Sequence, residues 1–293
     1  MFNILIYGRN LEIGGDFVEL TSYTNNKVEK SIKKVKGFYL LENFLDSYLK
    51  VNSVLVKGNI FVFSRETKEE THSMSVYKYP LSGGRWEKVA HMYDRRRCYS
   101  ACAIIDKVYV IGGVGSETMR SCVEFDTAGN KWKEVAGMKE ARSRAATALL
   151  GEMIVVSGGW GQFGYEGLRT VEMYDYARDT WSDMPKMVHG RMCHSLFSIK
   201  DKLFAVGDLK SVEMFDACCN RFVVVRSTPS LSKLYLDMYI KPVWIGENRV
   251  VFFLKGGTRL VASYNADENR LCEEWLEKTE DVCYEAVIRI PQL

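Results

Sequence analysis

The chain contains three segments that repeat one residue pattern, and this repetition constrains the fold more than any single motif. The segments are residues 104–138, 149–187 and 199–225. Each begins with a short apolar run ending at glycine, passes through a loop of variable length, and reaches an aromatic–Asp pair. A bulky residue follows seven positions after the aromatic. Repeats of this length indicate a solenoid or a propeller, in which each unit buries its apolar faces against its neighbours.

The spacing of the aromatic residue extends the repeat beyond these three copies. The clear copies have Phe125, Tyr174 and Phe215, which are 49 and 41 residues apart. Their bulky partners are Trp132, Trp181 and Phe222. Weaker copies surround Tyr79 and Tyr264, and the poorest copy lies near Tyr23. The sequence therefore predicts six units.

Within each unit the residues favour short β-strands. The apolar runs 108–111 and 153–157 are rich in β-branched residues and are closed by the pairs Gly112-Gly113 and Gly158-Gly159. Glycine suits a backbone that bends sharply or approaches a neighbour where a Cβ would clash. Turn-forming residues follow each aromatic–Asp pair, which gives four strands per unit. We expect Trp132 and Trp181 to pack between adjacent sheets.

A second shared element leads to a family. An Arg stands four residues after a Met in the pairs Met92–Arg96, Met138–Arg142 and Met187–Arg191. Together with the Gly-Gly pair, the S-V-E-x-Y-D-like run and the Trp, this pattern resembles the kelch repeat. The chain is most similar to the kelch domain of BTB–BACK–kelch (kelch-like) proteins. The resemblance implies an all-β, six-bladed kelch β-propeller with four antiparallel strands per blade.

The resemblance also implies the domain organisation. We expect residues 1–293 to form a single kelch β-propeller, closed by the C-terminal strand joining the first blade. Residues 283–290 are predicted to supply the innermost strand of that blade. The predicted blades are 1–36 plus 283–293, 49–90, 97–136, 143–186, 192–226 and 238–282.

In kelch-like proteins the BTB and BACK regions recruit a cullin. We expect no BTB or BACK region in this chain, since no helical pattern precedes the first predicted strand. Contact with a cullin would need those regions.

Composition argues against several kinds of partner. The net charge is +3, from 40 basic and 37 acidic residues, so no broad field for binding nucleic acid is expected. No apolar run is long enough to span a membrane. The eight cysteines are scattered without a C-x-x-C pair, which is typical of reduced thiols in a cytoplasmic protein.

Catalysis has little support in the sequence. There is no P-loop, no G-x-S-x-G and no H-E-x-x-H motif. The four histidines lack the spacing of metal ligands. We therefore expect no enzyme activity, no cofactor and no metal.

The loops offer better candidates for a binding site. The longest variable loop, 160–169, carries Trp160, Phe163 and Tyr165 among glycines, and aromatic side chains on a loop fit an interface. The alternative is that Trp160 folds back onto its own blade.

The arginines near the first strand of each unit divide into two groups. At the position shared by the copies, we interpret Arg96, Arg142 and Arg191 as structural residues that bridge blades through backbone carbonyls. Arg97 and Arg144 lie off that position and are predicted to contact a ligand. The resemblance implies that such arginines line the channel mouth and hold an acidic peptide motif, for which guanidinium groups are suited. We add His194, near a strand start, to the partner-binding set.

The hypothesis from the sequence is a non-enzymatic protein–protein interaction module. By resemblance, it would be the substrate-recognition domain of a kelch-like adaptor for a cullin-RING E3 ubiquitin ligase. The alternative is a kelch protein that binds actin in the cytoskeleton.

Overall fold

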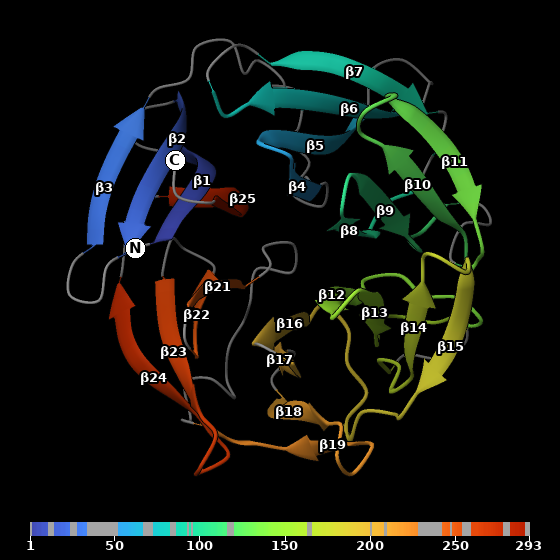
Figure 1. The fold of residues 1–293 in the computed structure, drawn as a ribbon, viewed down its shortest axis with the longest axis vertical. Coiled ribbons are helices and arrows are strands. Elements are labelled where there is room, and N and C mark those ends of the chain that lie inside the picture. The colour runs from blue at the N-terminus through green and yellow to red at the C-terminus, as the bar shows by residue number, and fades with distance from the viewer. Residues whose placement is uncertain are drawn as a thin grey trace. The chain divides into compact units, whose positions relative to one another are not determined.

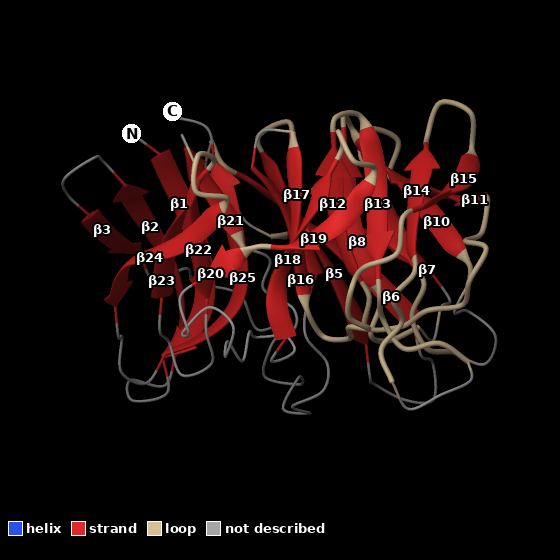
Figure 2. Cartoon of the chain, turned by 90° about the horizontal axis from the view of Figure 1, so that it is seen from below, coloured by secondary structure: helices blue, strands red, loops and turns tan. Residues whose placement is uncertain are grey.

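The computed structural model describes most of the chain. The described residues are 2–10, 15–23, 28–33, 52–66, 73–82, 86–92, 94, 96–115, 120–162, 166–199, 201–207, 210–227, 242–246, 248–253, 259–277 and 282–290. All regular structure among them is β-strand, as Figure 2 shows. Within these ranges no helix is long and apolar enough to cross a membrane.

The chain divides into two compact units, each described here by itself. Unit 1 comprises Met1–Val135 with Val282–Leu293, and unit 2 comprises Ala136–Asp281. The colours of Figure 1 follow the chain through the strands of both units.

Unit 1 holds three four-stranded antiparallel sheets. The first has the order β25-β1-β2-β3, with β1 Phe2–Asn10, β2 Gly15–Tyr23, β3 Val28–Lys33 and β25 Val282–Ile290. The second contains β4 Asn52–Val56, β5 Asn59–Glu66, β6 Ser73–Pro80 and β7 Glu87–Met92. The third contains β8 Ser100–Ile104, β9 Lys107–Ile111, β10 Cys122–Asp126 and β11 Lys131–Val135.

Unit 2 holds two four-stranded sheets and one five-stranded sheet. The first contains β12 Ala146–Leu150, β13 Met153–Ser157, β14 Val171–Asp175 and β15 Thr180–Met184. The second contains β16 Ser195–Ile199, β17 Lys202–Gly207, β18 Lys210–Asp216 and β19 Arg221–Val224. The third contains β21 Val243–Gly246, β22 Arg249–Phe253, β23 Arg259–Asn265, β24 Arg270–Glu277 and the short β20 Arg226–Ser227.

The described strands bear out the all-β prediction and the four-stranded antiparallel sheets, with one difference. In the third sheet of unit 2, β20 adds a fifth strand that runs parallel to β24, so this sheet is neither four-stranded nor purely antiparallel. The C-terminal strand β25 pairs with β1, with Leu5 opposite Ile288 (Figure 1). The closed six-bladed ring and the blade boundaries stay predictions.

Apolar side chains fill the spaces between neighbouring sheets within each unit. In unit 1, the ring of Phe63 on β5 meets the ring of Phe125 on β10 edge-on, with centroids 5.8 Å apart. Trp132 packs against the same Phe63 at 5.9 Å. In unit 2, Phe197 on β16 meets Phe252 on β22 at 5.4 Å. The sheets joined by these contacts thus bury apolar faces against each other within their unit, as expected for a repeat.

The turn between the third and fourth strands has the same design in four sheets. An Asp or Asn ends the third strand, and its side-chain oxygen accepts a backbone N–H two residues later. These residues are Asp126, Asp175, Asp216 and Asn265. Four positions further on, a left-handed residue closes the turn: Asn130, Asp179, Asn220 and Asn269. Asn and Asp tolerate this conformation better than most residues, so the pattern specifies the turn.

Gly158 occupies a position where both conformation and space exclude a side chain. Its φ is 58°, and a Cβ there would lie 2.5 Å from the carbonyl oxygen of Arg191 and 2.8 Å from Cε1 of His194. Gly151 has the same φ of 58°, but no atom lies within 4 Å of its would-be Cβ. A comparison of these two positions therefore distinguishes the cost of conformational strain from the cost of steric exclusion.

We expect Gly158→Ala to destabilise the protein more than Gly151→Ala. The left-handed conformation costs about 1–2 kcal/mol in either variant. Only Gly158→Ala adds the overpacking of a buried contact, about 1–3 kcal/mol more. Urea unfolding of both variants measures the difference, and equal losses would show that the contact with Arg191 and His194 is not restrictive.

Candidate functional site

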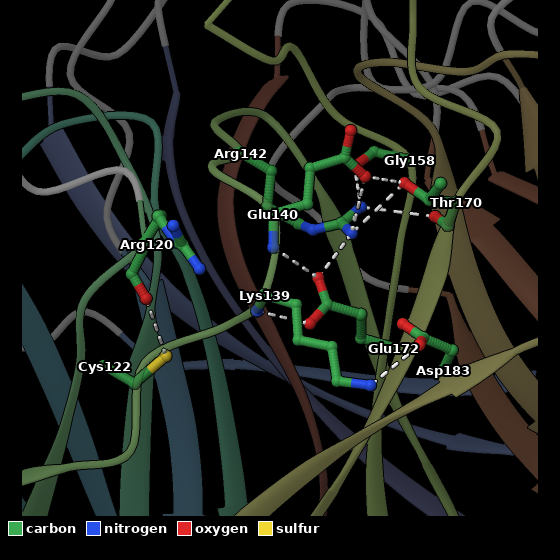
Figure 3. A network of polar contacts seen from close by, with 9 residues as sticks. All are labelled: Arg120, Cys122, Lys139, Glu140, Arg142, Gly158, Thr170, Glu172 and Asp183. Atoms are coloured by element: carbon green, nitrogen blue, oxygen red, sulfur yellow. Dashed lines mark hydrogen bonds and ion pairs between the residues drawn. The ribbon is translucent and has the colours of Figure 1, made fainter.

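Arg142 lies at the centre of a buried polar network in unit 2 (Figure 3). Its side chain is fully buried, and Nη1 donates to the carbonyl oxygens of Gly158 at 2.8 Å and of Thr170 at 3.2 Å. Nη2 donates to Oε1 of Glu172 at 2.7 Å and to Oε2 of Glu140 at 3.3 Å. Because Glu172 is also buried, the pair neutralises two charges that water cannot solvate.

Glu172 also binds the backbone that leads to Arg142. Its Oε2 accepts the N–H of Lys139 at 2.7 Å, and its Oε1 accepts the N–H of Glu140 at 3.2 Å. These amides lie in the segment before β12, whereas Glu172 lies on β14. The network therefore fastens the incoming segment to the third strand of the same sheet, as Figure 3 shows.

Arg191 repeats this arrangement in the next sheet of unit 2. It is fully buried, and Nη1 donates to the carbonyl oxygen of Gly207 at 2.8 Å. Nη2 donates to Oε1 of Glu213 at 2.9 Å. Glu213 accepts the N–H groups of Val188 at 2.5 Å and His189 at 3.1 Å. A buried Arg–Glu pair thus again attaches the incoming segment, here the one before β16, to the third strand of its sheet, β18.

Arg96 in unit 1 keeps the carbonyl contacts but takes a different acid. Nη1 donates to the carbonyl oxygens of Gly112 at 3.3 Å and Ser121 at 3.2 Å. Nε donates to Oδ2 of Asp94, two residues before it, at 2.5 Å. The guanidinium is again buried and paired.

One expectation for these arginines is corrected by the structure. We expected Arg96, Arg142 and Arg191 to bridge neighbouring blades. The carbonyls that they bind belong instead to their own sheets, at the end of the second strand and in the loop before the third. The arginines stabilise the loop edge of each sheet.

The acidic partners were missed in the sequence. Glu172 and Glu213 occupy the Glu position of the shared S-V-E-like run, which is the signal that could have identified them. Unit 1 has Val123 at this position, two residues before the aromatic, and the neighbouring Glu124 accepts from Nζ of Lys107 at 2.6 Å and from the Tyr109 hydroxyl at 2.8 Å. This hydrogen bond from Lys107 to Glu124 raises the pKa of the lysine.

The residue three positions after each of two arginines reaches the preceding sheet. The Tyr99 hydroxyl, before β8, donates to the carbonyl oxygen of Phe63 on β5 at 3.1 Å. Nε2 of His194, before β16, lies 2.8 Å from Oγ of Ser157 on β13. Within each unit this position links adjacent sheets through a buried hydrogen bond.

The structure therefore removes His194 from the predicted partner-binding set. Its residue exposure is only 4%, because Gly158 and Ser157 pack against it. Burial, with a further contribution from the charges of Arg191 and Arg142, lowers its pKa to about 3. His194 is a neutral interior residue.

Arg144 and Trp160, both predicted as partner-binding residues, contact each other. The Arg144 guanidinium lies 5.6 Å from the centroid of the Trp160 ring, a cation–π arrangement. Two backbone hydrogen bonds join Ser143 and Trp160, at 2.9 Å and 2.6 Å. These contacts hold Trp160 against the edge of its own sheet. The residue is nevertheless 37% exposed, so part of it is accessible to a partner. We call Arg144 and Trp160 the Arg–Trp rim.

The loop that follows Trp160 is anchored where it returns to the sheet. The N–H of Leu168 donates to the carbonyl oxygen of Gly159 at 2.8 Å, and the N–H of Arg191 donates to that of Leu168 at 3.0 Å. The loop end therefore connects two neighbouring sheets of unit 2. Phe163 and Tyr165, the other predicted aromatics, lie outside the described residues.

Arg97, the remaining predicted contact residue, lies in unit 1. Its side chain is exposed. Its backbone forms a two-bond bridge with Val114, at 2.9 Å and 2.7 Å, like the bridge between Ser143 and Trp160. Arg97 thus stands on a fixed backbone of the same local design.

The sheets and the shared Arg network define a kelch-repeat domain, and comparison with known proteins supports this class. The kelch motif matches residues 95–139 and 141–188. The chain therefore carries two kelch motifs and is similar to kelch-like proteins.

Individual relatives are similar over different extents. Kelch-like protein 36 of Rattus norvegicus is 28% identical over 218 residues, which cover 71% of this chain and 34% of that protein. Kelch-like protein 7 of Rattus norvegicus is 37% identical over 68 residues, 21% of this chain and 12% of that protein. Kelch repeat-containing protein kel-10 of Caenorhabditis elegans is 30% identical over 133 residues, 42% and 23% of the two chains. The chain spans about a third of the length of the first of these relatives.

We expect Arg142→Met to destabilise the protein by about 3–5 kcal/mol, because Glu172 would keep a buried charge without its partner. The double variant Arg142→Met/Glu172→Gln should recover part of this loss, since no uncompensated charge remains. Lys139→Met is the control. Its ion pair with Asp183 at 2.7 Å is exposed and should contribute less than about 1 kcal/mol. Urea unfolding measures all three variants, and similar losses for Arg142→Met and Lys139→Met would contradict this account.

We expect acid to destabilise the protein partly through His194. Its pKa is about 3 in the folded state and about 6.5 when unfolded, so below about pH 6.5 the unfolded chain binds more protons. Stability should therefore fall as the pH drops, by up to about 1.4 kcal/mol per pH unit from this residue. His194→Gln should flatten the dependence of unfolding free energy on pH between 6.5 and 4, as approximate limits set by these pKa values, whereas His91→Gln, at an exposed position, should not. A steep dependence retained in His194→Gln would refute the assignment.

Proposed function

We propose that this chain binds a protein partner through the Arg–Trp rim. The observation that carries the proposal is the half-exposed Trp160 ring held under the Arg144 guanidinium, 5.6 Å from its centroid. Trp and Arg are the residues most enriched among those that dominate binding energy at interfaces. Their backbone is already fixed by the bridge between Ser143 and Trp160, so little ordering entropy is lost when a partner binds.

The chemistry of the rim favours an acidic, partly apolar peptide segment. A guanidinium binds carboxylates in bidentate fashion, and the exposed part of the indole ring offers an apolar contact beside it. Arg97 in unit 1 is a separate candidate for contact with a carboxylate, and no shared site with the rim is implied. The argument for Arg97 rests on its exposure and on the local design that it shares with the Arg–Trp rim.

The proposed role is binding rather than catalysis. Among the described residues no group of three or more His, Cys, Asp or Glu side chains could hold a metal ion. The Ser157–His194 pair has a hydrogen bond like that of a nucleophile and its base, but Ser157 is 0% exposed and His194 4%. A substrate cannot reach that hydroxyl in this fold.

The cellular role that we propose is substrate recognition for a cullin-RING E3 ubiquitin ligase, with this chain as the kelch part of an adaptor. This step rests on the similarity to kelch-like proteins over 71% of the chain, because a fold alone does not define a function. The BTB and BACK regions that would contact the cullin are part of the proposal for the full adaptor.

We expect Trp160→Ala and Arg144→Ala each to lower partner affinity about tenfold or more, because interface residues of this kind contribute about 2 kcal/mol or more. Arg178→Ala and Val224→Ala are matched controls. Arg178 has a side chain 77% exposed on a turn, and Val224 is 49% exposed on an edge strand. Quantitative affinity purification followed by titration of the recovered protein measures the effect. If the two control variants lost as much binding as the two rim variants, the rim would not be the interface.

A second experiment separates the ligase role from binding alone. Expression of this chain should compete with the full adaptor and lengthen the half-life of the bound partner, whereas Trp160→Ala should not. Unchanged partner turnover with intact binding would leave a binding module outside ubiquitin ligation. Recovery of actin, confirmed by co-sedimentation with filaments, would instead support the cytoskeletal alternative.

A further inference from the structure

The turn between β18 and β19 carries two adjacent cysteines that the fold does not require. Cys218 and Cys219 lie at the tip of the turn, and the Asp216 carboxylate accepts their N–H groups at 2.9 Å and 3.3 Å. The corresponding positions in the three sister turns hold Ala128-Gly129, Ala177-Arg178 and Asp267-Glu268. Since such different residues serve in the same turn, the two thiols have no common structural task.

Both cysteine side chains are exposed to solvent. Cysteine is among the residue types most often buried in proteins. The other cysteines whose exposure the structure describes, Cys98, Cys102, Cys122, Cys193 and Cys272, are buried or half-buried. Two exposed thiols next to each other on a defined turn therefore need an explanation.

A disulfide between the two cysteines is disfavoured by geometry. Adjacent Cα atoms are about 3.8 Å apart across a trans peptide, whereas disulfides usually join Cα atoms about 4.4–6.8 Å apart. Closing this bond would also disturb the turn that Asp216 holds through its two N–H contacts. The pair is better suited to an acceptor atom that lies between the two sulfurs.

The neighbouring carboxylate also limits ordinary thiolate chemistry. The side-chain contact with Asp216, together with its negative charge, raises the pKa of the Cys219 thiol. At neutral pH this thiol stays protonated, which slows disulfide exchange because the thiolate is the reactive form. A protonated thiol can still react with an electrophile whose leaving group takes up the thiol proton, because no free thiolate is then needed.

We propose that Cys218 and Cys219 form a two-thiol binding site for trivalent arsenic carrying exchangeable oxygen ligands. In the reaction, two As–O bonds of an arsonous acid R–As(OH)₂ break and two As–S bonds form. Each thiol proton leaves with a hydroxide as water, so the products are R–As(S-Cys)₂ and two water molecules. Arsenic stays trivalent and no oxidant or reductant is consumed.

The adjacency of the thiols supplies the selectivity of the site. Once one sulfur has bound arsenic, the second is held beside it by the same turn, so the second bond forms within the molecule. Linking two binding events in this way increases affinity by about 10²–10⁴-fold over a single contact. Cys98 and Cys193 are half-buried and have no adjacent cysteine in the sequence, so they lack this advantage.

Phenylarsine oxide is a suitable probe, since each molecule binds two thiols and releases one water. The folded chain is incubated with one equivalent, and intact-mass measurement followed by peptide mapping locates the product. We expect one phenylarsenic group on the peptide that contains Cys218 and Cys219. Ethanedithiol should remove it, whereas excess glutathione, a monothiol, should not.

Cysteine variants decide the assignment. Cys218→Ser and Cys219→Ser should each lower the affinity about 100-fold or more, because the second bond is then lost. Cys98→Ser and Cys193→Ser, which remove half-buried thiols, should leave the affinity unchanged. Circular dichroism confirms that each variant is folded. Undiminished arsenical binding in the Cys218→Ser/Cys219→Ser double variant, or equal removal by glutathione and ethanedithiol, would overturn the proposal.

Discussion

The loop edge of each unit 2 sheet that carries the Arg network depends on a buried arginine bound to a buried glutamate. The two pairs are Arg142 with Glu172 and Arg191 with Glu213. All four side chains are buried away from water, so each charge is stabilised by the opposite charge of its partner. Both pairs also form hydrogen bonds with backbone groups at the loop edge of their sheets. The acids accept hydrogen bonds from amides of the incoming segment, and the arginines donate to the carbonyl oxygens of Gly158 and Gly207. Each Arg–Glu pair therefore holds the irregular backbone around it in a fixed conformation.

This fixed backbone determines the positions of the exposed side chains at the loop edge. Two residues after each arginine the chain adopts a left-handed conformation, at Cys98, Arg144 and Cys193, with φ of 55°, 53° and 57°. None of these is glycine or asparagine, so each position stores conformational strain. At Arg144 the strained backbone accompanies a guanidinium placed over Trp160. The hydrogen-bond network of Arg142 supports this conformation. The Arg–Trp rim therefore has its geometry before a partner binds.

Different parts of this structure were accessible from the sequence to different degrees. Periodic features, such as the apolar runs ending at glycine and the aromatic–Asp pair, act locally and indicated the strands and their turns correctly. Contacts between distant positions were less accessible: Glu172 lies 30 residues from Arg142, and its place in the S-V-E-like run marks it as a repeat position without showing which residue it binds. His194 failed for the same reason, because its burial depends on Gly158 and Ser157 of another sheet. The fifth strand β20 has two residues and pairs with a strand far along the chain, which no local pattern reveals.

The pairing of β25 with β1 has a consequence for how the protein is made. β25 follows every other described strand in the sequence, so the sheet that contains β1 stays incomplete until β25 has been synthesised. Until β25 has been synthesised, the edge of β1 that receives it offers unpaired backbone groups to other chains. The sheets built from consecutive strands carry no such delay, because their contacts are local in sequence. The edge of β1 is therefore exposed for longer than the edges inside the sheets built from consecutive strands.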